Sequence, residues 1–189
     1  MDKKTLRNIY LEKRKDLSLN EKTLLENAIL DHLFDNFNIE GTISSCFLPI
    51  TSMSEIDTWQ LITAITASKG EIALTIWDIE SNNLTHRLYS NDTTIVVNPF
   101  GIPEPENGQL INIFQLDYVF VPLLIADLNG HRVGYGKGVY DRFLENCSSS
   151  TKFIGLSLFE LVSSIDDINA FDIPLHACIT PTKCHYFEK

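Results

Sequence analysis

The hydrophobic pattern of the first forty residues predicts two helices. Between residues 3 and 16 the apolar positions recur at helical spacing: Leu6, Ile9, Tyr10 and Leu17. Ser18 and Glu21 then match a capping box, in which each side chain accepts one of the unpaired N–H groups at a helix start. We therefore expect a second helix from this point to about Phe37.

Beyond residue 40 the pattern changes to short apolar runs separated by turns. We expect strands over residues 43–48, 71–77, 118–126, 151–158 and 177–180, a helix over 57–68, and a hairpin partner for the second strand over 84–89. Strands that alternate with helices favour a parallel sheet. The predicted fold is therefore α/β: one domain over residues 1–189, a three-layer sandwich with a largely parallel central sheet flanked by helices.

A proline-rich segment over residues 97–106 interrupts this alternation. Pro99, Pro103 and Pro105 each lack an N–H donor and restrict the backbone to extended paths. We expect no regular secondary structure here. The segment is either a rigid connector or one wall of a site.

Composition narrows the functional classes. The chain has 189 residues, four cysteines and a net charge of −10, which argues against a nucleic-acid partner and against a disulfide framework. No membrane span and no signal peptide are recognisable, so we expect a reduced, cytoplasmic protein. Six of the fifteen basic residues nevertheless fall in the first fifteen positions. They predict either contact with a polyanionic ligand or a solvated helix face.

The most informative stretch is the alternation of three glycines with a lysine, Gly134-Tyr135-Gly136-Lys137-Gly138, placed between a predicted strand and a predicted helix. Glycines let backbone N–H groups approach an anion, and a helix N-terminus and a lysine add positive charge. The stretch lacks the third glycine of a dinucleotide fingerprint and the Lys-Ser/Thr pair of a P-loop. We interpret it as a phosphate site; the alternative is a tight connection with an exposed lysine.

Several other residues are candidates for a site, and most of them have more than one interpretation. Tyr135 and Tyr140 could stack on a ligand or pack in the core. Asp141 could orient Lys137, coordinate magnesium, or favour the helix dipole. Glu55, at a strand-to-helix junction, could accept hydrogen bonds from a ligand or serve as a helix N-terminal acid. A last group does not match a zinc spacing, so we expect structural roles for it: His176, Cys178, Cys184 and His185.

Four places together resemble one family. Residues 133–144 are similar to the GxGxGxYDRFL-like signature of the 5-formyltetrahydrofolate cyclo-ligases. Residues 3–7 resemble the K-x-x-L-R start of that family, residues 54–58 its E-[IV]-x-T segment, and residues 98–105 its G-I-P-E-P loop. The matches occur in order along the whole chain.

The resemblance implies conversion of 5-formyltetrahydrofolate to 5,10-methenyltetrahydrofolate with ATP and Mg²⁺. ADP and phosphate are released after a phosphorylated formyl intermediate has formed and N10 has closed the ring. It implies an ATP site built from Lys3, Lys4, Arg7, Gly134, Tyr135, Gly136, Lys137, Gly138, Val139, Tyr140, Asp141 and Arg142. It also implies a folate site built from Ile50, Glu55, Phe100, Lys137, Gly138, Val139, Tyr140 and Asp141.

Within these sets, the resemblance gives catalytic roles to Lys137, Asp141 and Arg142, and Asp141 is the candidate metal ligand. Three positions depart from the family: Val139 replaces a common aromatic residue, His176 stands where many members have an acid near the magnesium, and Tyr135 lies at a variable position and receives no catalytic role. We expect a monomer with two small-molecule partners and no nucleic-acid or membrane partner.

Two rival interpretations stay open on the residues alone. The first is a protein that binds a sugar phosphate or a coenzyme A ester on a similar scaffold. The joint presence of the basic start and the glycine-lysine turn argues against it, since one phosphate site would not require both. The second is a non-catalytic folate-binding protein, against which the intact Lys137, Asp141 and Arg142 argue.

Overall fold

The computed structural model describes residues 1–188 and is built around a seven-stranded sheet in the order β11-β10-β9-β6-β1-β2-β3. The five inner strands pair in parallel, and β11 and β3 add antiparallel edges. Their bounds are Ile43–Cys46 (β1), Glu71–Asp78 (β2), Asn83–Leu88 (β3), Tyr118–Pro122 (β6), Lys152–Leu156 (β9), Ala177–Ile179 (β10) and Cys184–Tyr186 (β11). The expected mixed α/β fold with a largely parallel sheet is confirmed.

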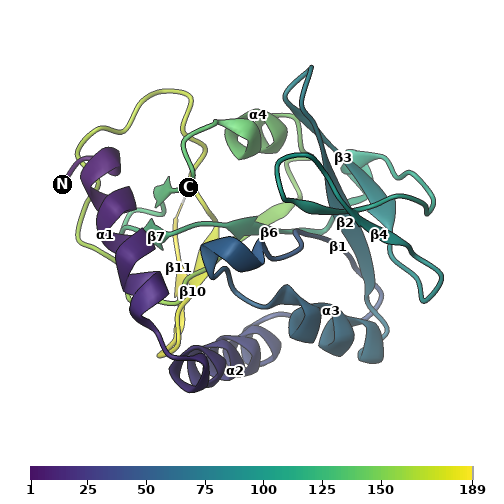
Figure 1. The fold of residues 1–189 in the computed structure, drawn as a ribbon, viewed down its shortest axis with the longest axis horizontal. Helices are drawn as coiled ribbons and strands as arrows, with labels where there is room; N and C mark the ends of the chain where they lie inside the picture. Colours follow the sequence, from purple (N-terminus) through teal and green to yellow (C-terminus); the bar gives the residue numbers. More distant parts are fainter. Residues whose placement is uncertain (189) are drawn as a thin grey trace.

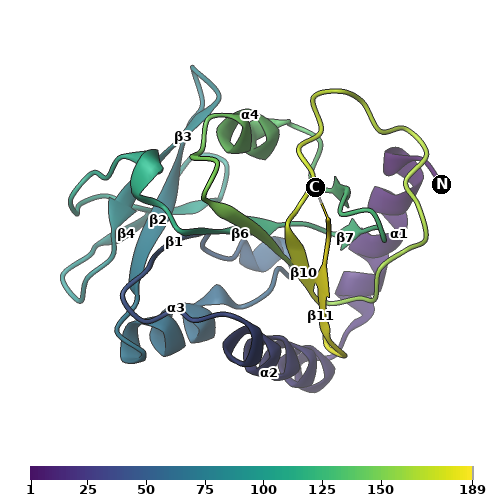
Figure 2. The ribbon, with the colours of Figure 1, turned by 180° about the vertical axis from the view of Figure 1, so that it is seen from behind.

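Helices lie on both sides of this sheet (Figure 1). The helices α2 (Leu19–Asn36) and α3 (Thr58–Ala67) cover one face, and α4 (Val139–Glu145) lies on the other, as the view from behind also shows (Figure 2). The remaining helix, α1 (Lys3–Asp16), packs beside the short strands β7 (Ile125–Ala126) and β8 (Arg132–Val133). This packing brings the basic N-terminal helix close to the segment that follows β8.

Local signals in the sequence set the helix boundaries. The predicted capping box is present, because the Ser18 hydroxyl accepts from Glu21 N and the Glu21 carboxylate accepts from Ser18 N. Asp2 and Asp57 cap α1 and α3 through their side chains. The helices accordingly start and end within about one residue of the predicted positions.

Two stretches differ from expectation. The apolar run predicted as one strand over 118–126 is two strands, since β6 ends at Pro122 and β7 turns away to pair antiparallel with β8. The expectation of no regular structure over 97–106 was wrong: β4 (Ile95–Val97) and β5 (Pro103–Pro105) form a small antiparallel pair.

The prolines are tolerated in that pair because flanking residues supply hydrogen bonds. Asn98 N donates to Ile102 O, and Glu106 N donates to Thr94 O, so both ends of the pair are closed without a proline N–H. The pair also holds the start of the loop that carries Phe100, and Phe100 itself is exposed. The chain from 97 to 106 is thus a rigid hairpin rather than an irregular connector.

Candidate active site

The glycine-lysine turn joins β8 to α4 and lies against the N-terminal helix. Gly136 and Gly138 have φ of +87° and +65°, backbone angles that glycine adopts without strain. Arg7 Nε donates to Gly134 O at 2.9 Å, and a Cβ atom on Gly136 would lie 3.1 Å from Arg7 Nη2. The structure therefore brings together two motifs that are 127 residues apart in the chain.

The other N-terminal basic residues differ in their surroundings. Lys4 is exposed on α1. Lys3 is half-buried, and its ammonium forms an ion pair with the Asp172 carboxylate, which also accepts from Asn169 N. Lys3 is thus neutralised in this structure, whereas the Arg7 guanidinium is held by an uncharged carbonyl.

Lys137 extends from the exposed middle of the turn toward two aromatic rings. Its Nζ lies 4.1 Å from the centroid of the Trp77 ring and 5.2 Å from that of Phe100. The two rings are 5.5 Å apart at an interplanar angle of 61°. Phe100, predicted for the folate site, therefore does lie beside Lys137, and Trp77 is a neighbour that the sequence did not single out.

Glu55 is buried, with 5% of its surface exposed, and both of its carboxylate oxygens are engaged. Oε2 accepts from Ile50 N at 2.6 Å, and Oε1 accepts from the Tyr135 hydroxyl at 2.5 Å. Burial raises the pKa of Glu55, while these hydrogen bonds and the charge of Arg14 act in the opposite direction. The carboxylate thus lies in the interior, at the level of the glycine turn.

Arg14 and Tyr135 complete this buried network. Arg14 Nη1 donates to the Tyr135 hydroxyl at 3.0 Å, and Nη2 donates to Leu123 O at 2.6 Å. Desolvation and the nearby Glu55 raise the pKa of Tyr135, so the phenol keeps its proton and donates a hydrogen bond to Glu55. One side chain of the glycine turn therefore points to the predicted folate acid, 80 residues away in the chain.

Asp141 is part of a polar cluster under α4. Its Oδ1 accepts from Arg132 Nη2 at 2.7 Å and from Ile173 N at 3.2 Å. Arg132 also donates to Ile173 O. Asp141 therefore orients Arg132 and a loop amide in this structure. None of these hydrogen bonds involves Lys137.

Residues 1–188 contain no preformed cluster of metal-binding side chains at the turn. Within residues 1–188 there is no group of three or more His, Cys, Asp or Glu side chains that could hold a metal ion. The one candidate, Asp141, is already paired with a guanidinium. His176 accepts a hydrogen bond from Phe153 N through Nδ1, and its ring packs on the Phe153 ring.

The remaining members of the predicted site lie on α4 and just before it. Tyr140 is packed in the apolar layer beside the ring of Phe143, and burial raises its pKa. Val139 is half-buried, and Arg142 is exposed, with its amide donating to Gly138 O. The core-packing interpretation of Tyr140 therefore fits its surroundings.

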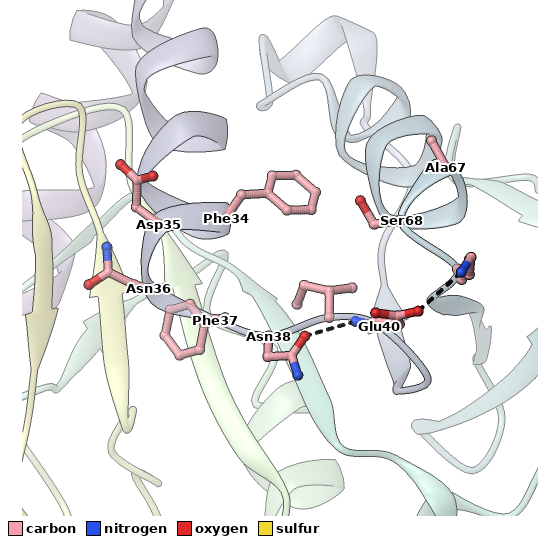
Figure 3. Close-up of a pocket in the computed structure, with 10 residues that line it drawn as sticks. Phe34, Asp35, Asn36, Phe37, Asn38, Glu40, Ala67 and Ser68 are labelled. Atoms are coloured by element: carbon pink, nitrogen blue, oxygen red, sulfur yellow. Dashed lines mark hydrogen bonds and ion pairs between the residues drawn. The ribbon is translucent and has the colours of Figure 1, made fainter.

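A wide hollow lies elsewhere on the molecule, between the ends of α2 and α3 (Figure 3). It has a volume of about 590 Å³ and is lined by residues 34–40 and 67–69, including the ion pair between Lys69 and Glu40. It contains none of the predicted site residues. It is lined mostly by polar groups together with Phe34 and Phe37, and it includes neither the glycines nor the lysine of the turn, so we place the candidate site at the turn.

The fold and the site define a class: an α/β protein in which a glycine-lysine turn, a basic helix and a buried carboxylate converge. The 5-formyltetrahydrofolate cyclo-ligase family model matches residues 1–181. The chain belongs to the 5-formyltetrahydrofolate cyclo-ligase family and is accordingly an enzyme of the ligase class.

Individual relatives agree with that assignment. The chain is 31% identical over 134 residues to the 5-formyltetrahydrofolate cyclo-ligase of Escherichia coli K12, which covers 68% of this chain and 73% of the relative. It is 27% identical over 186 residues to the 5-formyltetrahydrofolate cyclo-ligase of Mycoplasma genitalium, and the match covers 94% of this chain and 98% of the relative. The NMR structure of Aquifex aeolicus 5,10-methenyltetrahydrofolate synthetase superposes with a TM-score of 0.81 at 26% identity, covering 100% of this chain and 94% of that one.

Sequence reasoning missed three site residues for a common reason. Arg14, Trp77 and Arg132 stand in no motif, and each acts through a side chain from another element or turn. Only the burial of Arg14 has a signal in the sequence: it follows Leu6 and Tyr10 at intervals of four positions, on the buried face of α1. In the described part of the chain, no helix is long and apolar enough to cross a membrane.

Proposed function

We propose that this protein converts 5-formyltetrahydrofolate to 5,10-methenyltetrahydrofolate at the expense of ATP, with release of ADP and phosphate. The observation that supports this best is the convergence at the glycine turn. Arg7 and Lys137 supply positive charge on its outer side, and Tyr135 links it to the buried Glu55. A single turn therefore borders both a site for a polyanion and a site for a polar ring.

In this proposal the phosphates of ATP lie over residues 134–142, against Arg7, Lys3 and Lys4. Phosphoryl transfer needs positioning and neutralisation of charge more than covalent chemistry by the protein. Lys137 and the exposed Arg142 would neutralise charge on the transferred group. Lys3 would first have to leave Asp172, whereas the Arg7 guanidinium donates to Gly134 O and forms no ion pair within residues 1–188.

The folate lies on the inner side of the turn. Glu55 and Ile50 would hold the pterin, and Phe100 would stack on the flat part of the substrate. The formyl oxygen takes the γ-phosphoryl group and becomes part of a good leaving group. N10 then bonds to the activated carbon and loses its proton, and the C–O bond breaks to release phosphate. The protein thereby converts a poor leaving group, an amide-like oxygen, into phosphate before the ring closes.

Mg²⁺ enters this proposal as the ion that accompanies ATP, where it would reduce the charge of the phosphates. Because Asp141 is paired with Arg132, we assign the metal no further role and no preformed protein ligand. We further propose that residues 1–189 act as one domain, as a cytoplasmic monomer without a nucleic-acid or membrane partner.

The test is a direct assay with ATP, Mg²⁺ and 5-formyltetrahydrofolate, in which the absorbance of the methenyl product is followed. We expect product only when all three are present. Lys137→Ala should abolish turnover while 5-formyltetrahydrofolate still binds in calorimetry, and Lys152→Ala, which removes an exposed lysine outside the site, should be fully active.

Two results would contradict the proposal. Folded wild-type protein that binds 5-formyltetrahydrofolate but never forms product would indicate a non-catalytic folate-binding protein. Near-normal turnover by the Lys137→Ala variant would show that the lysine is not at the transferred phosphate.

A further inference from the structure

Trp77 is held in one orientation from both of its nitrogen atoms. Its backbone N donates to Glu104 Oε1 at 2.8 Å, and its indole Nε1 donates to Asn82 Oδ1 at 2.9 Å. Glu104 is buried, with 8% exposed, and Asn82 occupies a left-handed turn with φ of +56°. The ring is thus fixed by the β2–β3 hairpin and by β5, independently of the glycine turn.

The ammonium of Lys137 lies on this fixed ring. Nζ is 4.1 Å from the Trp77 centroid, and the centroid of the neighbouring Phe100 ring is 5.2 Å away. Within residues 1–188, Lys137 forms no ion pair with a carboxylate. Indole is the aromatic ring that attracts a cation most strongly. Lys137 is therefore held by two aromatic rings, and no carboxylate among the described residues compensates its charge.

Lys3 provides the contrast within the same molecule. Its ammonium is paired with Asp172, so an incoming phosphate must compete with a carboxylate for it. Competition of that kind is absent at Lys137, because an aromatic face restricts the side chain without compensating its charge. A restrained and uncompensated cation is what a developing negative charge requires.

We propose that Trp77 is a positioning residue for the ligase reaction: its indole face holds Lys137 at the junction of the two substrates before they bind. This inference rests on the proposed function, in which Lys137 acts on the transferred phosphoryl group. Trp77 does not itself touch the reacting atoms. It acts by limiting the conformations of a flexible side chain, and its loss is therefore expected to lower kcat more than it raises the KM for ATP.

The first test needs no substrate. The chain contains two tryptophans, Trp59 and Trp77, so the Trp59→Phe variant reports on Trp77 alone. In that background Lys137→Met should change the yield and wavelength of Trp77 emission, because the charge over the ring is removed. The matched control Lys152→Met should leave both unchanged. Identical emission in the Lys137→Met and control variants would overturn the contact.

The second test measures turnover. Trp77→Leu, which removes the ring, should lower kcat about two- to fivefold, the range that corresponds to an exposed cation–π contact. Trp77→Phe, which keeps a ring, should restore most of that loss. Urea unfolding of both variants separates an effect on folding from an effect on Lys137, since a structural role alone would make the loss of kcat follow the loss of stability.

The outcomes separate the two proposals. If wild-type protein is inactive but Trp77 emission responds to Lys137→Met, the proposed function fails while the contact stands. If wild-type protein is active and Trp77→Leu has wild-type kcat, the positioning role is refuted and the proposed function is untouched. A loss of kcat that Trp77→Phe does not restore also refutes it.

Discussion

Replacing Tyr135 by phenylalanine tests the buried link between the glycine turn and Glu55. The change removes one hydroxyl group and leaves the ring in place. That hydroxyl donates to Glu55 Oε1 at 2.5 Å and accepts from Arg14 Nη1 at 3.0 Å. After the substitution Glu55 keeps only the bond from Ile50 N, and Arg14 keeps only the bond to Leu123 O.

The expected loss of stability follows from the charges involved. A hydrogen bond to a charged group contributes about 1.5–3 kcal/mol, and an unsatisfied buried partner increases the cost of losing it. We expect the free energy of unfolding to fall by about 2–3 kcal/mol at pH 7.5. For a chain of this length that corresponds to a melting temperature about 5–10 °C lower. Tyr186→Phe is the matched control, because the Tyr186 ring is 62% exposed.

The same network predicts how the destabilisation by Tyr135→Phe depends on pH. Burial places the pKa of Glu55 above its ordinary value of 4.5, and the bond from Tyr135 lowers it. Removing that bond must raise the pKa of Glu55 further. The folded state then binds the proton more tightly than the unfolded chain does, so the destabilisation grows as pH rises above 4.5 and is smaller in acid.

The assays are urea unfolding at pH 4.5 and pH 7.5 and the pH profile of kcat/KM for 5-formyltetrahydrofolate. If the Glu55 carboxylate must be charged to hold the substrate, the acidic limb of the profile moves to higher pH in the Tyr135→Phe variant. A variant whose stability and acidic limb both match those of wild type would refute the account of this network.

Three further predictions concern the turn, the sheet and the basic helix. Gly136→Ala should lower the free energy of unfolding in urea by about 1 kcal/mol or more and weaken ATP binding, because φ is +87° and the new Cβ would lie 3.1 Å from Arg7 Nη2. Gly134→Ala is the control for strain, because nothing lies within 4 Å of its Cβ. His86 is fully buried, and burial lowers its pKa from 6.5 to about 4, so its contribution to stability is lost as pH falls through this range. Between pH 7.5 and 5 that loss is about 2 kcal/mol, and it should be missing in His86→Gln; equal pH dependence in both proteins would contradict it. Arg7→Gln should raise the KM for ATP about tenfold, whereas Lys13→Gln, exposed on the same helix, should not; equal effects would indicate a purely structural helix.

Local signals predicted the parts of the fold that local physics decides. The Ser18 capping box and the helical spacing before it depend on neighbours within four residues, so the sequence alone located them. The hairpin over 95–105 was missed because the proline rule describes each residue separately. Whether a proline is tolerated depends on which carbonyls and amides its partner strand offers, here those of Thr94 and Asn98.

The candidate site also has parts that the sequence predicted and parts that it did not. The sequence indicated the basic start and the glycine turn separately, and the family resemblance predicted that both belong to one ATP site. The structure adds the hydrogen bond from Arg7 to Gly134 O that connects them. The ATP contact predicted for Tyr135 stays a prediction, and the sequence did not indicate that its hydroxyl donates to Glu55. Side-chain direction in a turn depends on the φ angles of Gly136 and Gly138, which a sequence pattern does not contain.

The basic residues of the predicted ATP site differ in the kind of group that contacts each of them. A carboxylate at Lys3 removes net charge, whereas a carbonyl at Arg7 and aromatic faces at Lys137 leave it in place. A phosphate is attracted by uncompensated charge, because displacing a carboxylate costs about as much as the new contact contributes. Arg7 and Lys137 should therefore carry most of the attraction for ATP, and Lys3 and Asp172 should act chiefly to fix α1 against the loop before β10. In a protein of net charge −10, cations at this turn that form no ion pair among the described residues should direct a polyanion there.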